Sequence, residues 1–413
     1  MLAFRRTTRW RTRAASALAA GAAFFAPWAA AGADSVEAFL DRHWDHPLAP
    51  QGPPPATFSE RAASFDPADC AACHPARHRQ WRESRHAHAM GPGVLGQLRA
   101  MPPRRAESCL RCHAPLGEQR QSLARALGWP RADDAAPLPG YVPADLHARG
   151  LACPACHVRE HTRYGPPAQN RLPSAQAPHD GFVAQPAYRD SRFCRSCHQF
   201  APDGRRLNGK LLENTYEQWR QSRYADAGVS CQDCHMPGQS HRWPGIHEPD
   251  MVRRAVQSRL AQRRGADRWH VTGKITNAGA GHKLPTYLTA QLWAELVLLD
   301  GDDAVATLAR QPIGWKADLS LRNEAFDTRL APDGTVTLSA ALDPARARDR
   351  RAALRLRVAP QEFYERFFAA RLENGGLPVR ARRDLARALD AAKSTRFTLT
   401  LKTVALGMAD GRP

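Results

Sequence analysis

The sequence predicts an α+β protein, in which an irregular, mostly helical domain is followed by a C-terminal β-sandwich-like domain. Two observations carry this prediction. All ten cysteines lie before residue 236, and the chain around them is rich in Pro, Gly and Arg with little apolar alternation. From about residue 265 cysteine disappears, and runs of alternating apolar and β-branched residues begin.

The first part is organised by a motif, Cys-x-x-Cys-His, that occurs five times. The motifs are Cys70, Cys73 and His74; Cys109, Cys112 and His113; Cys153, Cys156 and His157; Cys194, Cys197 and His198; and Cys231, Cys234 and His235. Two thiols on one side of a helical turn can reach both vinyl groups of a porphyrin, and the next imidazole can bind its iron. The pattern predicts five covalent haem c groups, held by ten cysteines and ligated by five motif histidines.

Other uses of paired cysteines fit the pattern less well. A zinc knuckle, a redox dithiol or a structural disulfide does not require His after every pair. Asp66 and Pro67 predict a helix start just before the first motif, and Ser108 and Ser230 are expected to cap the second and fifth. With one motif per roughly forty residues, the porphyrin faces are expected to form the core of this domain.

Four segments are expected along the chain. Residues 1–33 have a basic start, an Ala/Phe-rich run and a small-residue cleavage site, which indicates a secretory signal peptide rather than a retained anchor. Residues 34–64 form a Pro-rich N-terminal arm whose His43 and His46 are expected at the surface. The pentahaem domain is expected at 65–264 and the β-domain at 265–413. The leader predicts a periplasmic or extracellular protein, and no later stretch is long and apolar enough to span a membrane.

The β-domain is expected to contain five strands and two helical insertions. The strand-like runs are 269–275, 290–298, 335–341, 353–358 and 397–404, and the helical patterns are 361–372 and 380–393. No catalytic motif is recognisable in this domain.

The formal net charge is +19, which would ordinarily indicate a nucleic-acid or anionic-membrane partner. Loss of the five leader arginines would leave +14, and the ten propionates of five haems would bring the holoprotein near +4. Arginine pairing with propionates explains the excess more simply. Nucleic acid is excluded as a partner of an exported haem protein, and an acidic or membrane-bound redox protein is expected instead.

An eight-residue segment is repeated on either side of the central motifs. Residues 80–87, Gln-Trp-Arg-Glu-Ser-Arg-His-Ala, match residues 218–225, Gln-Trp-Arg-Gln-Ser-Arg-Tyr-Ala, at six of eight positions. Thr215 to Gln218 form a capping-box pattern, so both copies are expected to be helical. The copies differ at His86 and Tyr224, so only the first supplies an imidazole.

Several of these segments resemble one family. The first motif followed by Trp81-x-x-Ser84-x-His86, the fifth motif followed by Met236-Pro237, and residues 277–286, Asn-Ala-Gly-Ala-Gly-His-Lys-Leu-Pro-Thr, are similar to multihaem cytochromes of the cytochrome c-554 type. The resemblance implies an exported electron carrier with mostly bis-histidine haems. The fifth motif is also similar to pentahaem nitrite reductases, but those have Cys-x-x-Cys-Lys at the catalytic haem, and here every motif ends in His.

Twelve histidines outside the motifs could supply the second axial ligands. His86 matches the family motif, with His88 as its rival, and His247 follows the fifth motif as downstream ligands do in this family. His161 would serve a neighbouring haem, because it lies too close to its own motif. His179 is a further candidate. His282 follows two glycines and precedes Pro285, in a loop suited to aim one side chain from the β-domain. Met90 and Met236 are alternative thioether ligands.

Electron transfer along five haems is the expected function, with redox proteins as partners in respiration. The alternative is an oxidoreductase acting on a small nitrogen or sulfur compound at one open haem, and a third hypothesis is a subunit of a larger respiratory complex. A closed, six-coordinate iron favours the carrier, because a catalytic haem needs a free position. No catalytic residue is therefore assigned.

Overall fold

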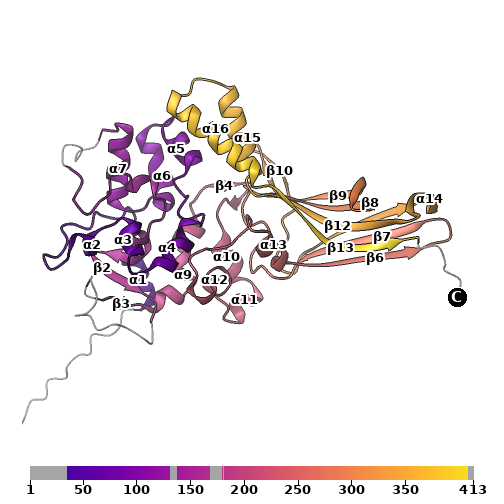
Figure 1. Ribbon diagram of the computed structural model, residues 1–413, viewed down its shortest axis with the longest axis horizontal. Coiled ribbons are helices and arrows are strands. Elements are labelled where there is room, and N and C mark those ends of the chain that lie inside the picture. Colours follow the sequence, from indigo (N-terminus) through magenta and orange to yellow (C-terminus); the bar gives the residue numbers. More distant parts are fainter. Residues whose placement is uncertain (1–34, 131–136, 168–178, 180, 408–413) are drawn as a thin grey trace, which may run out of the picture. The chain divides into compact units, whose positions relative to one another are not determined.

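The computed structural model describes residues 35–130, 137–167, 179 and 181–407. The expected signal peptide lies outside these residues. Short helices dominate up to Ala255 and long strands follow, so the predicted α+β class is confirmed (Figure 1). From Val36 onward the chain forms one compact unit.

The first part consists of short helices and turns joined by extended segments (Figure 1). Its helices are α1 Val36–His43, α2 Glu60–Ala63, α3 Pro67–Ala71, α4 Pro75–Arg82, α5 Pro92–Leu98, α6 Pro103–His113, α7 Gly117–Leu127, α8 Cys153–His157, α9 Arg192–His198, α10 Thr215–Arg220, α11 Arg223–Asp226, α12 Cys231–His235 and α13 Pro249–Ala255. Three tight turns of helix are η1 Leu146–Ala148, η3 Pro186–Arg189 and η4 Pro237–Gln239. Its short strands are β1 Val158–Arg159, β2 Thr162–Gly165, β3 Val183–Ala184, β4 Arg206–Leu207 and β5 Lys210–Leu211.

Four of the five motifs end a helix with their histidine, in α6, α8, α9 and α12. Asp66 caps α3, its Oδ1 accepting from the N–H of Ala68 at 2.9 Å, as the sequence predicted. Ser230 likewise caps α12. The prediction for Ser108 is wrong, because α6 begins earlier, at Pro103, and the Ser108 hydroxyl donates inside the helix to the carbonyl of Arg105.

The C-terminal part is a sandwich of two antiparallel sheets (Figure 1). Its strands are β6 Val256–Arg264, β7 Trp269–Asn277, β8 Gln291–Asp300, β9 Asp303–Ala317, β10 Glu324–Asp327, β11 Thr335–Leu342, β12 Arg350–Ala359 and β13 Phe397–Leu406. One sheet has the order β10-β9-β8-β12-β13 and the other β11-β7-β6. Three helices are inserted between strands: α14 Pro344–Ala347, α15 Glu362–Glu373 and α16 Val379–Ser394. The five predicted strands and two predicted helices are all present.

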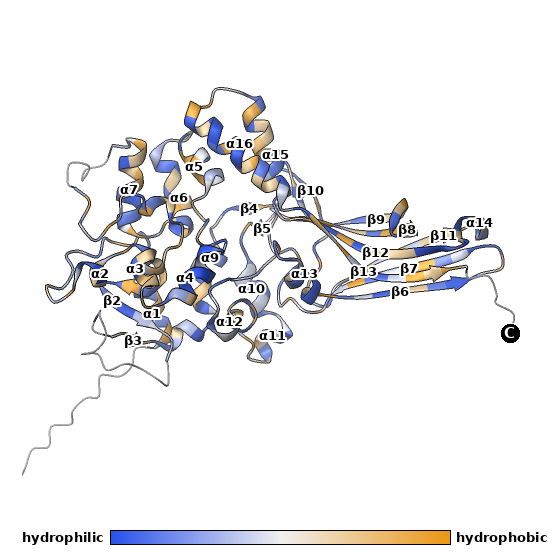
Figure 2. Ribbon diagram, viewed as in Figure 1, coloured by the Kyte–Doolittle hydropathy of each residue, from blue (hydrophilic) through white to orange (hydrophobic). Residues whose placement is uncertain are grey.

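The sandwich core lies between the two sheets and is apolar. Val271 and Ile275 of β7 pack with Leu296 of β8 and with Leu354 and Leu356 of β12 in one buried cluster. Buried and exposed positions alternate along β11, and Figure 2 shows polar and apolar residues mixed along these strands. Because successive side chains of a strand point to opposite faces, every second residue faces the core. This alternation made the strands recognisable from the sequence.

Strand β6 precedes residue 265, where the β-domain was expected to begin. It pairs with β7 along its whole length, from Val256 opposite Asn277 to Arg264 opposite Trp269. Its sequence, Val-Gln-Ser-Arg-Leu-Ala-Gln-Arg-Arg, carries little strand signal because it is an edge strand with polar outward residues. Strand β9 was also not anticipated.

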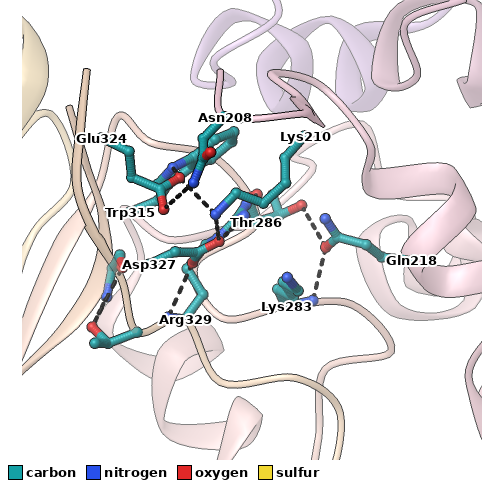
Figure 3. A network of polar contacts seen from close by, with 11 residues as sticks. Asn208, Lys210, Gln218, Lys283, Thr286, Trp315, Glu324, Asp327 and Arg329 are labelled. Atoms are coloured by element: carbon teal, nitrogen blue, oxygen red, sulfur yellow. Dashed lines mark hydrogen bonds and ion pairs between the residues drawn. The ribbon is translucent and has the colours of Figure 1, made fainter. Parts of the chain in front are cut away.

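Side chains from the sandwich hold a hairpin of the first part. Lys210 of β5 places its Nζ 2.6 Å from Glu324 and 2.8 Å from Asp327 of β10 (Figure 3). Trp315 donates its Nε1 to Glu324 at 2.7 Å, and Arg329 pairs with Asp327 at 2.8 Å. A second connection joins α5 to α16, where Arg99 and Asp384 are 3.0 Å apart. Arg223 of α11 and Asp333, two residues before β11, are 3.3 Å apart, so charged contacts link the two parts at three places.

Replacing Leu354 with Ala should destabilise the sandwich, because this fully buried side chain packs between the sheets. The expected loss in free energy of unfolding is about 2–5 kcal/mol, measured by denaturant titration. Thr337→Ala, at an exposed position of β11, is the matched control and should change stability little. Equal effects of the two variants would contradict this account of the core.

Candidate functional site

The fold gathers the five motifs by contacts between their cysteines. Thiol contacts join Cys70 to Cys153, Cys112 to Cys197, and Cys194 to Cys231. All ten cysteines are free thiols. The first motif thus adjoins the third, the second adjoins the fourth, and the fourth adjoins the fifth.

Four of the five motif histidines can present the same ring nitrogen to a ligand. Three of them place Nδ1 at a backbone carbonyl: His113 at Ala89 (2.6 Å), His157 at Tyr164 (2.8 Å) and His235 at Pro244 (2.8 Å). In His198 the Nδ1 is 3.4 Å from the hydroxyl of Tyr287. A hydrogen bond from Nδ1–H fixes the tautomer and leaves the lone pair on Nε2, which is the arrangement of a metal-binding histidine.

Three motif histidines have a second imidazole opposite them. The ring centres of His157 and His241 are 6.1 Å apart, those of His198 and His86 are 6.3 Å apart, and those of His235 and His282 are 6.3 Å apart. Two metal–nitrogen bonds of about 2 Å each, with about 1.1 Å from each bonding nitrogen to its ring centre, give a separation of about 6.2 Å. The spacing fits two axial rings on one iron.

The first motif also has an imidazole near it. Burial, and after it the proximity of His179, lowers the pKa of His74. His179 places its Nδ1 2.6 Å from the carbonyl of Gly181, the same anchoring that the motif histidines use. In the described part of the chain, His113 has neither a ring contact with another histidine nor an electrostatic effect from one, so the second motif differs from the other four.

Four of the six paired histidines are neutral at pH 7 and lie largely inside the protein. Burial lowers the pKa of His86 to about 3, and those of His198, His241 and His282 to about 4. A neutral imidazole has the lone pair that a metal requires. Although protein surrounds these rings, each keeps some accessible surface. Uncharged imidazoles that keep some accessible surface and lie in pairs with ring centres 6.1–6.3 Å apart suit a flat prosthetic group, so the residues present fit haem.

His161 and His247, both expected as ligands, are placed differently. The Nε2 of His161 is 2.9 Å from the carbonyl of Gly52, and the Nε2 of His247 is 3.3 Å from the Nε2 of Gln361. Neither contacts a motif histidine through its ring among the described residues. In both, the nitrogen that would bind iron already has a polar neighbour.

The sequence analysis expected His43 and His46 at the surface, and this prediction is wrong. His43 is buried, with its Nε2 2.9 Å from the carbonyl of Cys156, and burial lowers its pKa to about 2. His46 lies 3.2 Å from the hydroxyl of Ser196, inside the fourth motif. The arm is therefore held against the third and fourth motifs, because its histidines satisfy polar groups of those motifs.

His241 was not recognised as a candidate from the sequence. It lies six residues after His235, and His247 follows the same motif at twice that distance. Spacing along the chain does not separate them. The distinguishing feature is Nδ1, which in His241 is anchored 2.9 Å from the carbonyl of Gln239, leaving Nε2 free.

The loop before His282 is shaped by close backbone packing. A side chain on Gly279 would meet the carbonyl oxygen of Arg254 at 2.0 Å, so only glycine fits there. Asn277 donates its Nδ2 to the carbonyl of His282 at 2.9 Å, and the Nδ1 of His282 is 2.9 Å from the carbonyl of Lys283. The loop joins β7 to β8, so a residue of the sandwich faces a motif of the first part.

Two further features are absent from the residues that the structure describes. These residues contain no group of three or more His, Cys, Asp or Glu side chains that could hold a metal ion by itself. They also contain no helix with the length and apolar character needed to cross a bilayer.

The fold is similar to that of a solved multihaem protein. A penta-haem cytochrome c552 from Thermochromatium tepidum matches 83% of this chain and 98% of its own, with a TM-score of 0.54 and 19% sequence identity. The chain thus has the fold of a pentahaem cytochrome c. No family model and no curated protein sequence matches it.

The pH dependence of stability can test whether the carboxyl group of Glu213 is enclosed by the protein. Burial raises the pKa of this carboxyl group to about 7, although Thr215 donates hydrogen bonds that lower it. The native state then binds more protons than the unfolded state between about pH 4.5 and 7, so this group lowers stability as the pH rises. The loss amounts to about 3 kcal/mol above pH 7.

Glu213→Gln should remove this contribution. Urea unfolding at pH 5 and pH 8 should show a smaller decrease in stability with rising pH for the variant than for the unmodified protein. An unchanged pH dependence would mean that Glu213 is hydrated rather than enclosed.

Proposed function

We propose that the chain is an exported pentahaem cytochrome c that carries electrons between redox proteins. The observation that carries this proposal is the set of three imidazole pairs, each with a motif histidine on one side and ring centres 6.1–6.3 Å apart. Five attachment motifs and the pentahaem fold support the same conclusion. Paired axial histidines leave iron without a substrate position, which suits a carrier.

Each group of residues has a defined part in this function. The two cysteines of each motif would form the thioether bonds to a porphyrin, and the motif histidine would bind its iron. His241, His86 and His282 would supply the second iron ligands of the third, fourth and fifth haems, and His179 that of the first. When bound, haem iron supplies a one-electron Fe(III)/Fe(II) couple. Three thiol contacts, together with the proximity of Cys156 to Cys194, order the motifs as first, third, fourth and fifth, with the second beside the fourth.

Export follows from the leader and from the chemistry of covalent haem attachment, which takes place outside the cytoplasm. The partners are expected to be acidic or membrane-bound redox proteins. Arginine is abundant enough to pair with haem propionates and still leave a positive surface. Nucleic acid is not expected as a partner.

A second candidate function is reduction or oxidation of a small nitrogen or sulfur compound at one open haem. It is favoured by the second motif, whose His113 has no histidine ring in contact with it among the described residues. Tyr364 of α15 lies close to Cys109 of this motif, and burial raises its pKa. A haem without an opposite histidine would have room for a small ligand.

The ligand assignment predicts different results for two neighbouring histidines. His241→Ala should convert one haem from low-spin to high-spin, because it removes the imidazole opposite His157. His247→Ala should leave the spin state of that haem unchanged. Electron paramagnetic resonance of the oxidised holoprotein measures both, and the reverse pattern would assign the ligand to His247.

Carbon monoxide separates the two candidate functions. Titration of the reduced holoprotein should fill at most one haem, the second. No binding would exclude catalysis at an open haem, whereas one equivalent would support it. Binding at several haems would overturn the paired-histidine assignment.

A further inference from the structure

The repeated segment, residues 80–87 and 218–225, is not explained by haem attachment or by ligation alone. Each copy begins in a helix, with residues 80–82 at the end of α4 and residues 218–220 at the end of α10. The remainder of the first copy forms turns and the remainder of the second enters α11, so the prediction that both copies are helical is confirmed only in part. The expected capping box at Thr215–Gln218 is absent, and Asn214 is the N-cap residue. The side chain of Gln218 is instead turned away from its own helix end.

In the first copy, Gln80 and Trp81 hold two different segments. The Oε1 of Gln80 accepts the backbone N–H of His241 at 3.0 Å, and Trp81 donates its Nε1 to the carbonyl of Leu151 at 2.7 Å. Leu151 lies two residues before Cys153, where the third motif begins. The two side chains thus restrain both His241 and the start of the motif that contains its partner, His157.

In the second copy, Gln218 and Trp219 make the corresponding contacts. The Oε1 of Gln218 accepts the backbone N–H of Lys283, the neighbour of His282, at 3.0 Å. Trp219 donates its Nε1 to the carbonyl of Val229 at 3.0 Å. Val229 lies two residues before Cys231, where the fifth motif begins.

The position one helical turn before the glutamine contacts the same loop in each copy. Arg77 reaches the carbonyl of Gly238 at 3.4 Å, and the hydroxyl of Thr215 is 2.7 Å from that of Thr286. The hydroxyl of Thr286 also donates to Gln218 at 3.3 Å, a contact drawn in Figure 3. Residues three apart share one face of a helix, so in each copy two side chains on that face contact the loop that carries the second histidine.

These matching contacts do not follow from local chain geometry. In the first copy the glutamine and tryptophan contacts span 161 and 70 residues, whereas in the second they span 65 and 10. The same two side chains nevertheless connect equivalent points: the segment of the second histidine, and the position two residues before the motif.

We infer that each Gln-Trp pair is a clamp that positions the two axial histidines of one haem. Gln80 and Trp81 position His241 and His157 of the third haem, and Gln218 and Trp219 position His282 and His235 of the fifth. The inference rests on the proposed haem ligation. Neither residue pair is assigned as an iron ligand, so both act as positioning residues. Without the amide acceptor, the segment of the second histidine is freer to move, and that histidine leaves the iron more readily.

The copies also differ in an informative way. Where the first copy supplies His86 to the fourth haem, the second has Tyr224, whose hydroxyl donates to the carbonyl of Ala278 at 2.5 Å. Ala278 precedes His282 in the same loop. In the second copy, the residue that corresponds to His86 therefore holds the loop that contains His282.

The test uses the holoprotein and carbon monoxide binding after reduction. Gln218→Leu should raise binding above that of the unmodified protein by up to one equivalent, and Gln80→Leu should do the same at a different haem. Combination with His282→Ala identifies the haem. Gln218→Leu should add nothing to His282→Ala, because both open the fifth haem, whereas Gln80→Leu should add to it.

Two further variants control for a merely structural effect. Gln218→Glu keeps an oxygen acceptor and should retain the carbon monoxide stoichiometry of the unmodified protein, and Gln221→Leu, at the exposed end of the same helix, should also retain it. If Gln218→Leu does not accumulate, Trp219→Phe removes the other contact and should open the same haem. The inference is overturned if Gln218→Leu adds to His282→Ala, or if neither glutamine variant changes binding. Failure of the proposed function would be distinct, because the unmodified protein would then lack five covalent haems by mass.

Discussion

Two of the three histidine pairs, His157 with His241 and His235 with His282, depend on one type of hydrogen bond, from the ring Nδ1 to a backbone carbonyl. It recurs in His113, His157 and His235 of the motifs, and in His179, His241 and His282 outside them. Anchoring one nitrogen sets the ring direction and keeps the lone pair on the other, so the imidazole is ready to bind iron before iron arrives. Histidines such as His43 and His161 use Nε2 for a backbone carbonyl instead, and they stabilise chain segments.

The sandwich contributes to the site as well as covering it. His282 comes from the loop between β7 and β8, and it faces His235 of α12. Lys210 and the β10 carboxylates hold the adjoining hairpin, while Gln218 holds the loop itself. An iron bound between His235 and His282 would therefore join two parts of the chain that charged contacts already bring together, and relative motion between them would disturb its ligation.

The repeat indicates how such a site can be built twice. A helix that carries Gln and Trp side by side has an acceptor for one segment and a donor for another, with both side chains satisfied. Buried polar groups require such partners, so the two segments are selected by hydrogen bonding as well as by packing. Within the described ranges no second imidazole contacts His113 of the second motif, and Tyr364 of α15 lies close to its Cys109.

Sequence alone predicted the haem-attachment motifs and the fold class, and the structure confirms the fold class. A Cys-x-x-Cys-His motif is local, since its cysteines and histidine lie within two helical turns, and the period-two strands of the sandwich are local as well. Which histidines lie beside the motif histidines was predicted only in part. His86, His179 and His282 lie near motif histidines, but His241 does so where His247 was expected. The tertiary structure decided this, because the second imidazole comes from a segment outside the motif. The position of His241 depends on the carbonyl of Gln239 that its Nδ1 meets and on Gln80, which accepts its backbone N–H.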